Sequence, residues 1–518
     1  MEKALTLTGK SLTIEEVAQV ARAGRSVALG ATALARARRS HAALLRRSQT
    51  KIIYGVNTGF GPMASRLVGK GDLAQLQLNL IRSHSCGAGE WVADEYVFAA
   101  MVVRLNALLR GDSGVSVNLL KFLRTLLNAR IAPLVPEHGG VGASGDLIQL
   151  AHIALAVIGE GDVRMRGKKM PASEALKRAR LSPHILGPKE GLALINGTSF
   201  MAGIGCLVLT DARRLLRLAL ASSALALETA HAFDDCLDPY LHNARPHKGQ
   251  RKAAHLLRAL TAGSRLLRRR SLFETSQAPG EETTDLESAA QDVYSLRCTP
   301  QIVGPMLENL FESERVLSIE INSATDNPLI TAGGKALHGG NFHGEYVAAA
   351  MDRVKVALVK LSMLSERRIN FFLHSAVNRR FPPFLTMRTP GLTLGLQGLQ
   401  FTAVSTTARN QSLAYPHSVH SIPSNGDNQD IVSMGADAAL IAAQVVNQTS
   451  VVLAVELAAL SQAVATAREE KKLGAQSKVL LQSVRRIFPI VGEDRFLSAH
   501  IQKLAAALRR GELPIPEF

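Results

Sequence analysis

The chain has 518 residues, of which 47% are hydrophobic but only 4% aromatic, and its formal net charge is +17. This length exceeds the usual size of one domain, and an alanine- and leucine-rich composition favours helices. The four cysteines are dispersed without metal-ligand spacing, and we recognise neither a secretory signal nor an apolar span long enough for a membrane helix. We therefore expect a reducing, cytoplasmic setting, with no metal, nucleotide cofactor or membrane.

Long amphipathic stretches, separated by segments rich in glycine, proline and asparagine, predict a mainly α fold built as a long-helix bundle. We expect an N-terminal, loop-rich region at residues 1–200 and a central and C-terminal helical bundle at 201–518. Polar motifs fall in the breaks between the stretches, where loops hold functional groups. Four such stretches are residues 208–233, 306–321, 345–372 and 435–469.

Two segments near the N-terminus carry side chains suited to proton transfer or polar recognition. Residues 54–61 read Tyr-Gly-Val-Asn-Thr-Gly-Phe-Gly, so Tyr54 heads a loop with three glycines behind it. The alternative for such a tyrosine is a half-buried packing residue. Residues 82–87 read Arg-Ser-His-Ser-Cys-Gly, in which His84 can donate or accept a hydrogen bond or serve as a structural core histidine.

Residues 139–146 read Gly-Gly-Val-Gly-Ala-Ser-Gly-Asp and contain a tripeptide that can cyclise on its own backbone. Gly145 has no side chain, so its amide nitrogen can approach the Ala143 carbonyl closely. Loss of water closes a five-membered ring, and a second dehydration at Ser144 leaves an exocyclic methylidene. This electrophile has no counterpart among unmodified side chains, and it predicts chemistry on amines.

An ordinary turn and a phosphate-binding glycine loop are the alternatives for this segment. The phosphate loop fits poorly because residues 131–136 carry two prolines and should make a poor strand, and no Gly-Lys-Ser/Thr follows. Residues 146–158 predict a helix, which places Ser144 at the positive end of a helix dipole. Asp146, His152 and His343 are conceivable metal ligands, but support of the tripeptide loop explains them better.

Further polar residues follow in chain order. Asn196 lies at a break between apolar segments, where an amide can cap a helix or bind a ligand. Tyr294 and Arg297 are three apart, on one face if the segment is helical. The planar, forked guanidinium of Arg297 suits the binding of a carboxylate. The alternative role for Arg297 is a structural ion pair with the acidic stretch 281–292. The remaining polar segments are residues 322–329, 339–345 and 424–430.

Taken together, these segments resemble the aromatic amino acid ammonia-lyases, a family of histidine, phenylalanine and tyrosine lyases and related aminomutases. The resemblance runs from about residue 10 to at least 470, with six segments in the family's order. It implies that Ala143, Ser144 and Gly145 become 4-methylidene-imidazol-5-one (MIO) and that the N-terminal region of an ammonia-lyase-like fold bears it. It also implies a homotetramer whose active sites draw on more than one chain.

The resemblance further implies the roles of individual residues. Tyr54 would be the base that takes the β-proton, and since a free phenol has a pKa near 10, it needs positive charge or hydrogen bonds nearby. Arg297 would bind the substrate carboxylate, supported by Asn327 or Asn322. Around the substrate, Tyr294 and Asn196 would surround the MIO ring and the amine, and Phe342 would pack near the aromatic ring.

Two positions bear on the substrate. Histidine lyases typically carry a glutamate where this chain has Gln429, next to Asn428, and a neutral amide removes the natural partner of an imidazole. His84 can bond a phenol hydroxyl, and a site built for a hydroxyl rejects the analogue lacking it. We expect non-oxidative deamination of L-tyrosine to trans-4-coumarate and ammonia. The alternatives are a phenylalanine ammonia-lyase, a tyrosine 2,3-aminomutase and, less favoured, a histidine ammonia-lyase.

The positive charge raises a rival class, a protein that binds nucleic acid or an anionic surface. Basic residues gather at 245–252 and 265–270. Aromatic residues are not interleaved there, and no nucleic-acid-binding module is visible in the sequence. A solvated basic face is the favoured interpretation, with a small aromatic amino acid as the partner.

Overall fold

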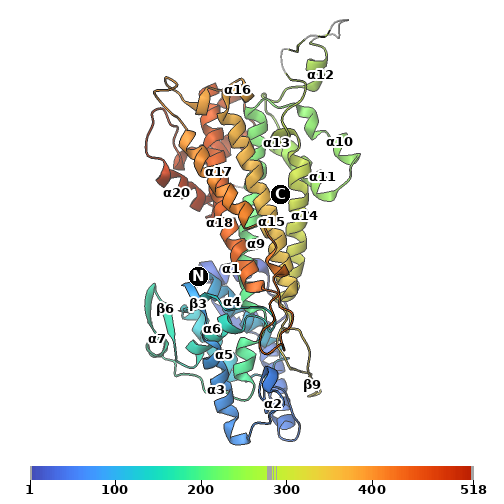
Figure 1. Cartoon of the computed structure of the whole chain (residues 1–518), viewed down its shortest axis with the longest axis vertical. Coiled ribbons are helices and arrows are strands. Elements are labelled where there is room, and N and C mark those ends of the chain that lie inside the picture. Colours follow the sequence, from blue (N-terminus) through green and yellow to red (C-terminus); the bar gives the residue numbers. More distant parts are fainter. Residues whose placement is uncertain (1–2, 277–282, 284, 287–288, 515–518) are drawn as a thin grey trace. The chain divides into compact units, whose positions relative to one another are not determined.

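The computed structural model describes residues 3–276, 283, 285–286 and 289–514 (Figure 1). The chain forms two compact units, and each is assembled from separate segments. All of residues 1–200 fall in unit 1, which also takes in two later segments. Unit 1 comprises Met1–Thr210, Glu312–Asp352 and Pro416–Ala443, and unit 2 comprises Asp211–Phe311, Arg353–Tyr415 and Gln444–Phe518.

The helices of unit 1 form around a buried central helix, α4, whose residues 97–109 are all buried. Helix α1 packs on α4 and has a complete capping box, in which the Thr13 hydroxyl accepts from the Glu16 amide at 3.1 Å. Gly24 ends α1 in the left-handed conformation at φ 71°. The helices are α1 Ile14–Ala23, α2 Ala31–Ser48, α3 Leu73–His84, α4 Asp94–Leu109, α5 Val117–Asn128, α6 Leu147–Val157, α7 Ala172–Arg178 and α8 Glu190–Ile195.

Short strands in unit 1 connect these helices. Contrary to the sequence expectation, residues 131–136 contribute to two strands, β4 and β5. Pro133 ends β4 and Pro136 begins β5, and both strands pair on one side only, so the missing proline N–H groups cost little. The sheets pair β1 Leu5–Leu7 with β2 Val27–Leu29, β3 Ala88–Trp91 with β5 Pro136–His138, β4 Ile131–Pro133 with β6 Asp162–Met165 and β7 Lys168–Pro171, and β8 Leu329–Ile330 with β9 Ala336–Leu337.

Unit 2 is a helical bundle with a charged pair in its core. Arg368 and Glu456, on α15 and α18, approach to 2.6 Å, and both side chains are fully buried. Arg368 also donates to the Ser223 hydroxyl of α9 at 2.6 Å, so three helices meet there. The helices with residues in this unit are α9 Ser199–Thr229, α10 Pro239–Asn243, α11 Lys248–Leu260, α12 Arg270–Glu274, α13 Tyr294–Arg297, α14 Thr299–Glu320, α15 Glu345–Leu373, α16 Ser375–Asn378, α17 Gln397–Ser412, α18 Gly435–Ala467, α19 Ala475–Ile487 and α20 Ser498–Arg510.

The prediction of a mainly α fold with long helices is confirmed. The statement that no apolar span reaches membrane length was wrong, because α18 is long and apolar enough to meet that criterion. Of the most apolar 18-residue stretch of α18, 67% is buried inside the protein, which is typical of a core helix.

Candidate active site

The tripeptide at residues 143–145 lies in the loop between β5 and α6, pressed against the backbone at Gly197. Gly145 has φ +73°, and a Cβ atom there would lie 2.1 Å from the Gly197 oxygen. The Asp146 amide donates to the same oxygen at 2.8 Å. Only glycine fits at residue 145, because the Gly197 backbone occupies the space that a side chain would need.

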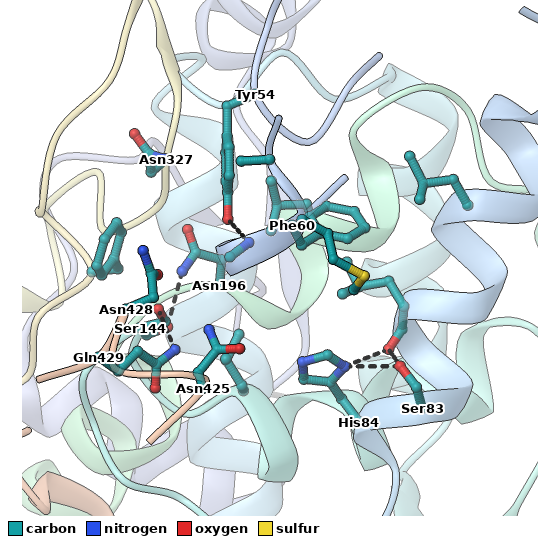
Figure 2. A pocket seen from close by; sticks show the side chains of 18 of the residues that line it. Tyr54, Phe60, Ser83, His84, Ser144, Asn196, Asn327, Asn425, Asn428 and Gln429 are labelled. Atoms are coloured by element: carbon teal, nitrogen blue, oxygen red, sulfur yellow. Dashed lines mark hydrogen bonds between the residues drawn. The ribbon is translucent and has the colours of Figure 1, made fainter. Parts of the chain in front are cut away.

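Amide side chains from two distant segments hold both oxygens of Ser144 (Figure 2). Asn196 Nδ2 donates to the Ser144 carbonyl at 2.9 Å, and Gln429 Nε2 donates to the Ser144 hydroxyl at 3.1 Å. Ala143 is buried, with 5% of its surface exposed. A buried alanine, a fixed serine and a glycine that accepts no side chain fit the requirements of ring closure to MIO.

Asp146 fixes this loop to the start of another helix. Its carboxylate accepts from the amides of Phe200 and Met201 at 2.9 and 3.0 Å, in the first turn of α9. Burial raises the pKa of the Asp146 carboxyl to about 7. Asp146 therefore supports the loop, as the sequence analysis preferred.

The two histidines considered as metal ligands are also engaged elsewhere. His152 Nε2 accepts from the Gly87 amide at 3.2 Å, and the His343 ring lies 3.4 Å from the Ile431 carbonyl. Within residues 3–276 and the later described segments, no three metal-ligating side chains come together.

A cavity of about 480 Å³ opens beside Ser144, entirely within unit 1. Its volume falls in the range of small-molecule sites, roughly 300–1,000 Å³. Its wall brings together residues from distant segments, between Tyr54 and Gln429, that the sequence had indicated one by one. Those that line it are Tyr54, His84, Ser144, Asn196, Asn327, Phe342, Asn428 and Gln429.

Tyr54 projects from the loop after α2, and its phenolic oxygen accepts from the Gly61 amide at 3.0 Å (Figure 2). Phe60 meets the Tyr54 ring edge-on, with centroids 6.3 Å apart. The amide donor stabilises negative charge on the phenolic oxygen, which is the kind of help that a tyrosine base requires.

We expect Gly61→Ala to lower kcat/KM by about tenfold, because it disturbs the hydrogen bond to Tyr54. Gly61 has φ +52°, and an added Cβ would lie 2.6 Å from Nδ2 of Asn425. Gly71→Ala is the matched control, since nothing lies within 4 Å of its added Cβ. Steady-state kinetics of both variants test this, and equal activity of the two would contradict it.

One face of α3 forms a wall of the cavity. Leu76, Asn79, Leu80, Ser83 and His84 line it at helical spacing. Of these five residues, only His84 was predicted from the sequence. The others lie three or four residues apart on the same helix face, and that spacing could have indicated them. Other lining residues that it missed include Phe60, Met63, Ala64, Leu147, Leu192 and Asn425.

His84 ends α3, and one ring nitrogen is held by its own helix. Nδ1 lies 3.0 Å from the Leu80 carbonyl and 3.0 Å from the Ser83 hydroxyl (Figure 2). The carbonyl can only accept, so Nδ1 carries the proton. In the neutral ring Nε2 is then a hydrogen-bond acceptor, and burial lowers the pKa of His84, which favours that neutral form.

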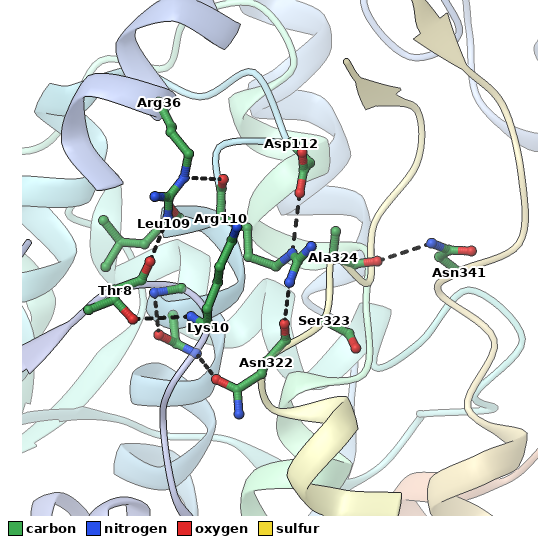
Figure 3. A network of polar contacts seen from close by, with 12 residues as sticks. Thr8, Lys10, Arg36, Leu109, Arg110, Asp112, Asn322, Ser323, Ala324 and Asn341 are labelled. Atoms are coloured by element: carbon green, nitrogen blue, oxygen red, sulfur yellow. Dashed lines mark hydrogen bonds and ion pairs between the residues drawn. The ribbon is translucent and has the colours of Figure 1, made fainter. Parts of the chain in front are cut away.

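The two asparagines offered as supports of the carboxylate site differ in their surroundings. Asn327 lines the cavity, and its Oδ1 accepts from the Gly339 amide at 2.8 Å. Asn322 belongs to another network, where its carbonyl accepts from Arg110 Nη1 at 2.6 Å (Figure 3). Its Oδ1 accepts from the Leu12 amide at 2.9 Å. Asn322 therefore serves the framework of unit 1.

Tyr294 and Arg297 lie in unit 2 and are not among the residues that line the cavity. They form the two ends of the single-turn helix α13, and the Arg297 guanidinium lies 4.7 Å from the centre of the Tyr294 ring. Arg297 Nε donates to the main-chain carbonyl of Asp292 at 3.0 Å. Part of the acidic stretch 281–292 lies outside the described residues, and in the described part Arg297 forms no ion pair.

An Ala-Ser-Gly loop beside a small-molecule cavity, in a mainly helical fold, is the arrangement that the resemblance to the ammonia-lyases predicts. The chain belongs to the aromatic amino acid lyase family, whose model matches residues 12–486, and is a MIO-dependent aromatic amino acid ammonia-lyase.

Relatives with different substrates resemble the chain about equally. A histidine ammonia-lyase of Geobacillus thermodenitrificans is 41% identical over 98% of this chain and 97% of its own length. A tyrosine ammonia-lyase of Cupriavidus metallidurans is 40% identical over 98% and 96%. The crystal structure of tyrosine aminomutase from Streptomyces globisporus matches with a TM-score of 0.95 at 38% identity, covering 99% of this chain and 98% of that one. The overall sequence identity therefore does not distinguish between histidine and tyrosine as the substrate.

Proposed function

We propose that this enzyme converts L-tyrosine to trans-4-coumarate and ammonia, using MIO formed from its own Ala143, Ser144 and Gly145. The observation that carries the choice of tyrosine is the acceptor nitrogen of His84 in the cavity wall. A homotetramer with shared active sites and a cytoplasmic setting are part of the same proposal.

Formed from the backbone of this loop, MIO would supply an electrophilic carbon for the substrate amine. Before the ring forms, Asn196 and Gln429 donate to the carbonyl and hydroxyl oxygens of Ser144 and hold the loop at the cavity wall. The second dehydration removes the hydroxyl, and the carbonyl oxygen that Asn196 binds is retained. The loop also precedes the eleven-residue helix α6, whose N-terminal dipole favours negative charge near Ser144. The chain thus supplies a donor and a positive potential where negative charge would develop.

Tyr54 takes the β-proton in this proposal. Its phenolic oxygen is within the cavity lining and receives the Gly61 amide hydrogen bond. Arg297 binds the substrate carboxylate through its planar fork in this proposal. Phe342 packs against the substrate ring in the cavity, and the family resemblance assigns the substrate amine to Tyr294.

The para-hydroxyl of tyrosine donates to Nε2 of His84. Because Nδ1–H is already committed to Leu80, the neutral ring offers only an acceptor at Nε2. Phenylalanine would leave that acceptor unpaired in a half-buried site, which costs about 1–3 kcal/mol. This supports tyrosine over phenylalanine.

Gln429 supports tyrosine over histidine. It replaces a carboxylate with a neutral amide, so a substrate imidazole finds no anionic partner there. Before the ring forms, its Nε2 is bonded to the Ser144 hydroxyl, and its Oε1 lies 3.4 Å from the Ser424 hydroxyl. The role suggested by the structure is support of the tripeptide loop as well as contact with the substrate.

We expect His84→Phe to reverse the preference for tyrosine over phenylalanine, lowering the ratio of kcat/KM values by about tenfold or more. In the unchanged enzyme this ratio should be constant above pH 7 and fall in acid, because protonation at Nε2 removes the acceptor. In His84→Phe the ratio should not depend on pH.

Competition assays with both amino acids from pH 5.5 to 9 test this expectation, and the ratio cancels titrations common to the two substrates. A pH-dependent ratio that survived His84→Phe would mean that another group reads the hydroxyl.

A tyrosine 2,3-aminomutase is the second candidate, favoured by the likeness to the Streptomyces globisporus enzyme. An aminomutase holds the unsaturated acid for re-addition of ammonia, whereas a lyase releases it. Chromatography of the products separates the two, since only the aminomutase accumulates β-tyrosine.

A further inference from the structure

Two arginines of the basic segment 265–270 enclose an aromatic ring in unit 2. The guanidinium carbons of Arg268 and Arg270 lie 3.8 and 3.7 Å from the centre of the Phe233 ring. We call Phe233, Arg268 and Arg270 the arginine clamp. The Arg268 backbone pairs with Ala232 and Asp234 at 2.9 Å each, so the clamp is fixed at its base.

The arginine clamp holds the segment that leads into α13. Arg268 Nη2 donates to Oδ1 of Asp292 at 3.0 Å, and the Phe233 amide donates to Oδ2 at 2.8 Å. Arg270 Nη1 donates to the carbonyl of Ala290 at 2.8 Å. Both carboxylate oxygens of Asp292 are therefore occupied, which fixes the direction of its main chain.

That main chain in turn orients Arg297. The Asp292 carbonyl accepts from Nε of Arg297 at 3.0 Å, while the guanidinium rests 4.7 Å from the centre of the Tyr294 ring. With Nε engaged and one face against a ring, rotation of the guanidinium is restricted. Its two Nη groups form no hydrogen bond to the described residues, so the end of the fork remains for a carboxylate.

We infer that Asp292 is a positioning residue: the arginine clamp fixes its main chain, and its carbonyl holds Nε of Arg297 so that the two Nη groups stay available for the substrate carboxylate. The inference rests on the proposed role of Arg297 in binding that carboxylate. It also gives the basic segment a function, because Arg268 and Arg270 are committed to internal partners.

The test compares inhibition by 4-coumarate with inhibition by its neutral amide, 4-coumaramide, in the full-length enzyme. Asp292→Ala should raise the inhibition constant of 4-coumarate by about tenfold or more and change that of the amide little. The reason is that a misoriented Arg297 guanidinium loses its two charged hydrogen bonds to the carboxylate. Asp292→Asn, which keeps one acceptor oxygen, should give a smaller change in the same direction. Equal losses for both inhibitors, or no loss for either, would overturn the inference.

Asp238→Ala is the matched control. Asp238 is also in unit 2 and caps α10 by accepting from the Tyr240 amide at 2.7 Å, without contact to Arg297. Both inhibition constants should be unchanged in this variant. A selective loss of 4-coumarate binding here would contradict a specific role for Asp292.

A double variant distinguishes the carboxylate-binding role of Arg297 from the positioning role of Asp292. Arg297→Ala should itself weaken 4-coumarate binding, and adding Asp292→Ala should cost nothing further, because the residue acts only through Arg297. Unchanged binding in Arg297→Ala would reject the carboxylate role and the inference with it. A loss in Arg297→Ala with none in Asp292→Ala, or additive losses, would reject the positioning role alone.

Discussion

Ser144→Ala abolishes MIO formation and with it turnover. Removing one electrostatic donor from an active site already costs about 10²–10³-fold in kcat, and loss of the electrophile should exceed that. The fold should persist, because the Ser144 hydroxyl only accepts one hydrogen bond, from Gln429. Asn196 bonds the main-chain carbonyl, which alanine retains.

Mass spectrometry of the peptide containing residues 143–145 measures this directly, alongside kcat. The unchanged enzyme should give a peptide lighter by two water molecules, and Ser144→Ala should not. Ser48→Ala is a suitable control, because the Ser48 hydroxyl donates to the Leu45 carbonyl of its own helix, and alanine keeps the main-chain carbonyl that Asn57 binds. Full activity of Ser144→Ala would refute the self-derived cofactor.

Tyr54→Phe should lower kcat by about 10²–10⁴-fold, the usual contribution of a general base, with MIO intact. Phenylalanine keeps the edge-on contact with Phe60 and loses only the acceptor of the Gly61 amide. An amide left without this partner costs about 1 kcal/mol, which a chain of this size tolerates. KM should change little, because the phenol acts on the β-proton and does not anchor the substrate.

Single-turnover kinetics and the peptide mass together distinguish a chemical defect from a missing cofactor. Tyr240→Phe serves as the control, since this tyrosine is 84% exposed in unit 2. If Tyr54→Phe retained normal turnover with MIO present, a different base would be required.

Long helices were predictable because their apolar periodicity is a local property. The expected stretch 345–372 is α15, Glu345–Leu373, almost residue for residue. Helix α9 instead begins at Ser199, because its first turn is capped by the distant carboxylate of Asp146. Helix α14 begins at Thr299 and continues through Pro305, where local rules predict a break.

The cavity was predictable only in part. Ser144, Asn196 and Gln429 lie far apart in the sequence, and motif resemblance brought them together before their hydrogen bonds were known. Asn425 lies in the polar segment 424–430 but was given no role, because its position beside Gly61 depends on how two loops pack. Similarly, the tautomer of His84 depends on the Leu80 carbonyl, which residue types alone do not reveal.

Product formation from tyrosine, phenylalanine and histidine, assayed in parallel by absorbance and chromatography, tests the central proposal most directly. We expect mainly trans-4-coumarate from tyrosine, with little cinnamate or urocanate. Urocanate as the main product would contradict the proposal, because it would show that Gln429 does not exclude an imidazole and that His84 does not select a phenol.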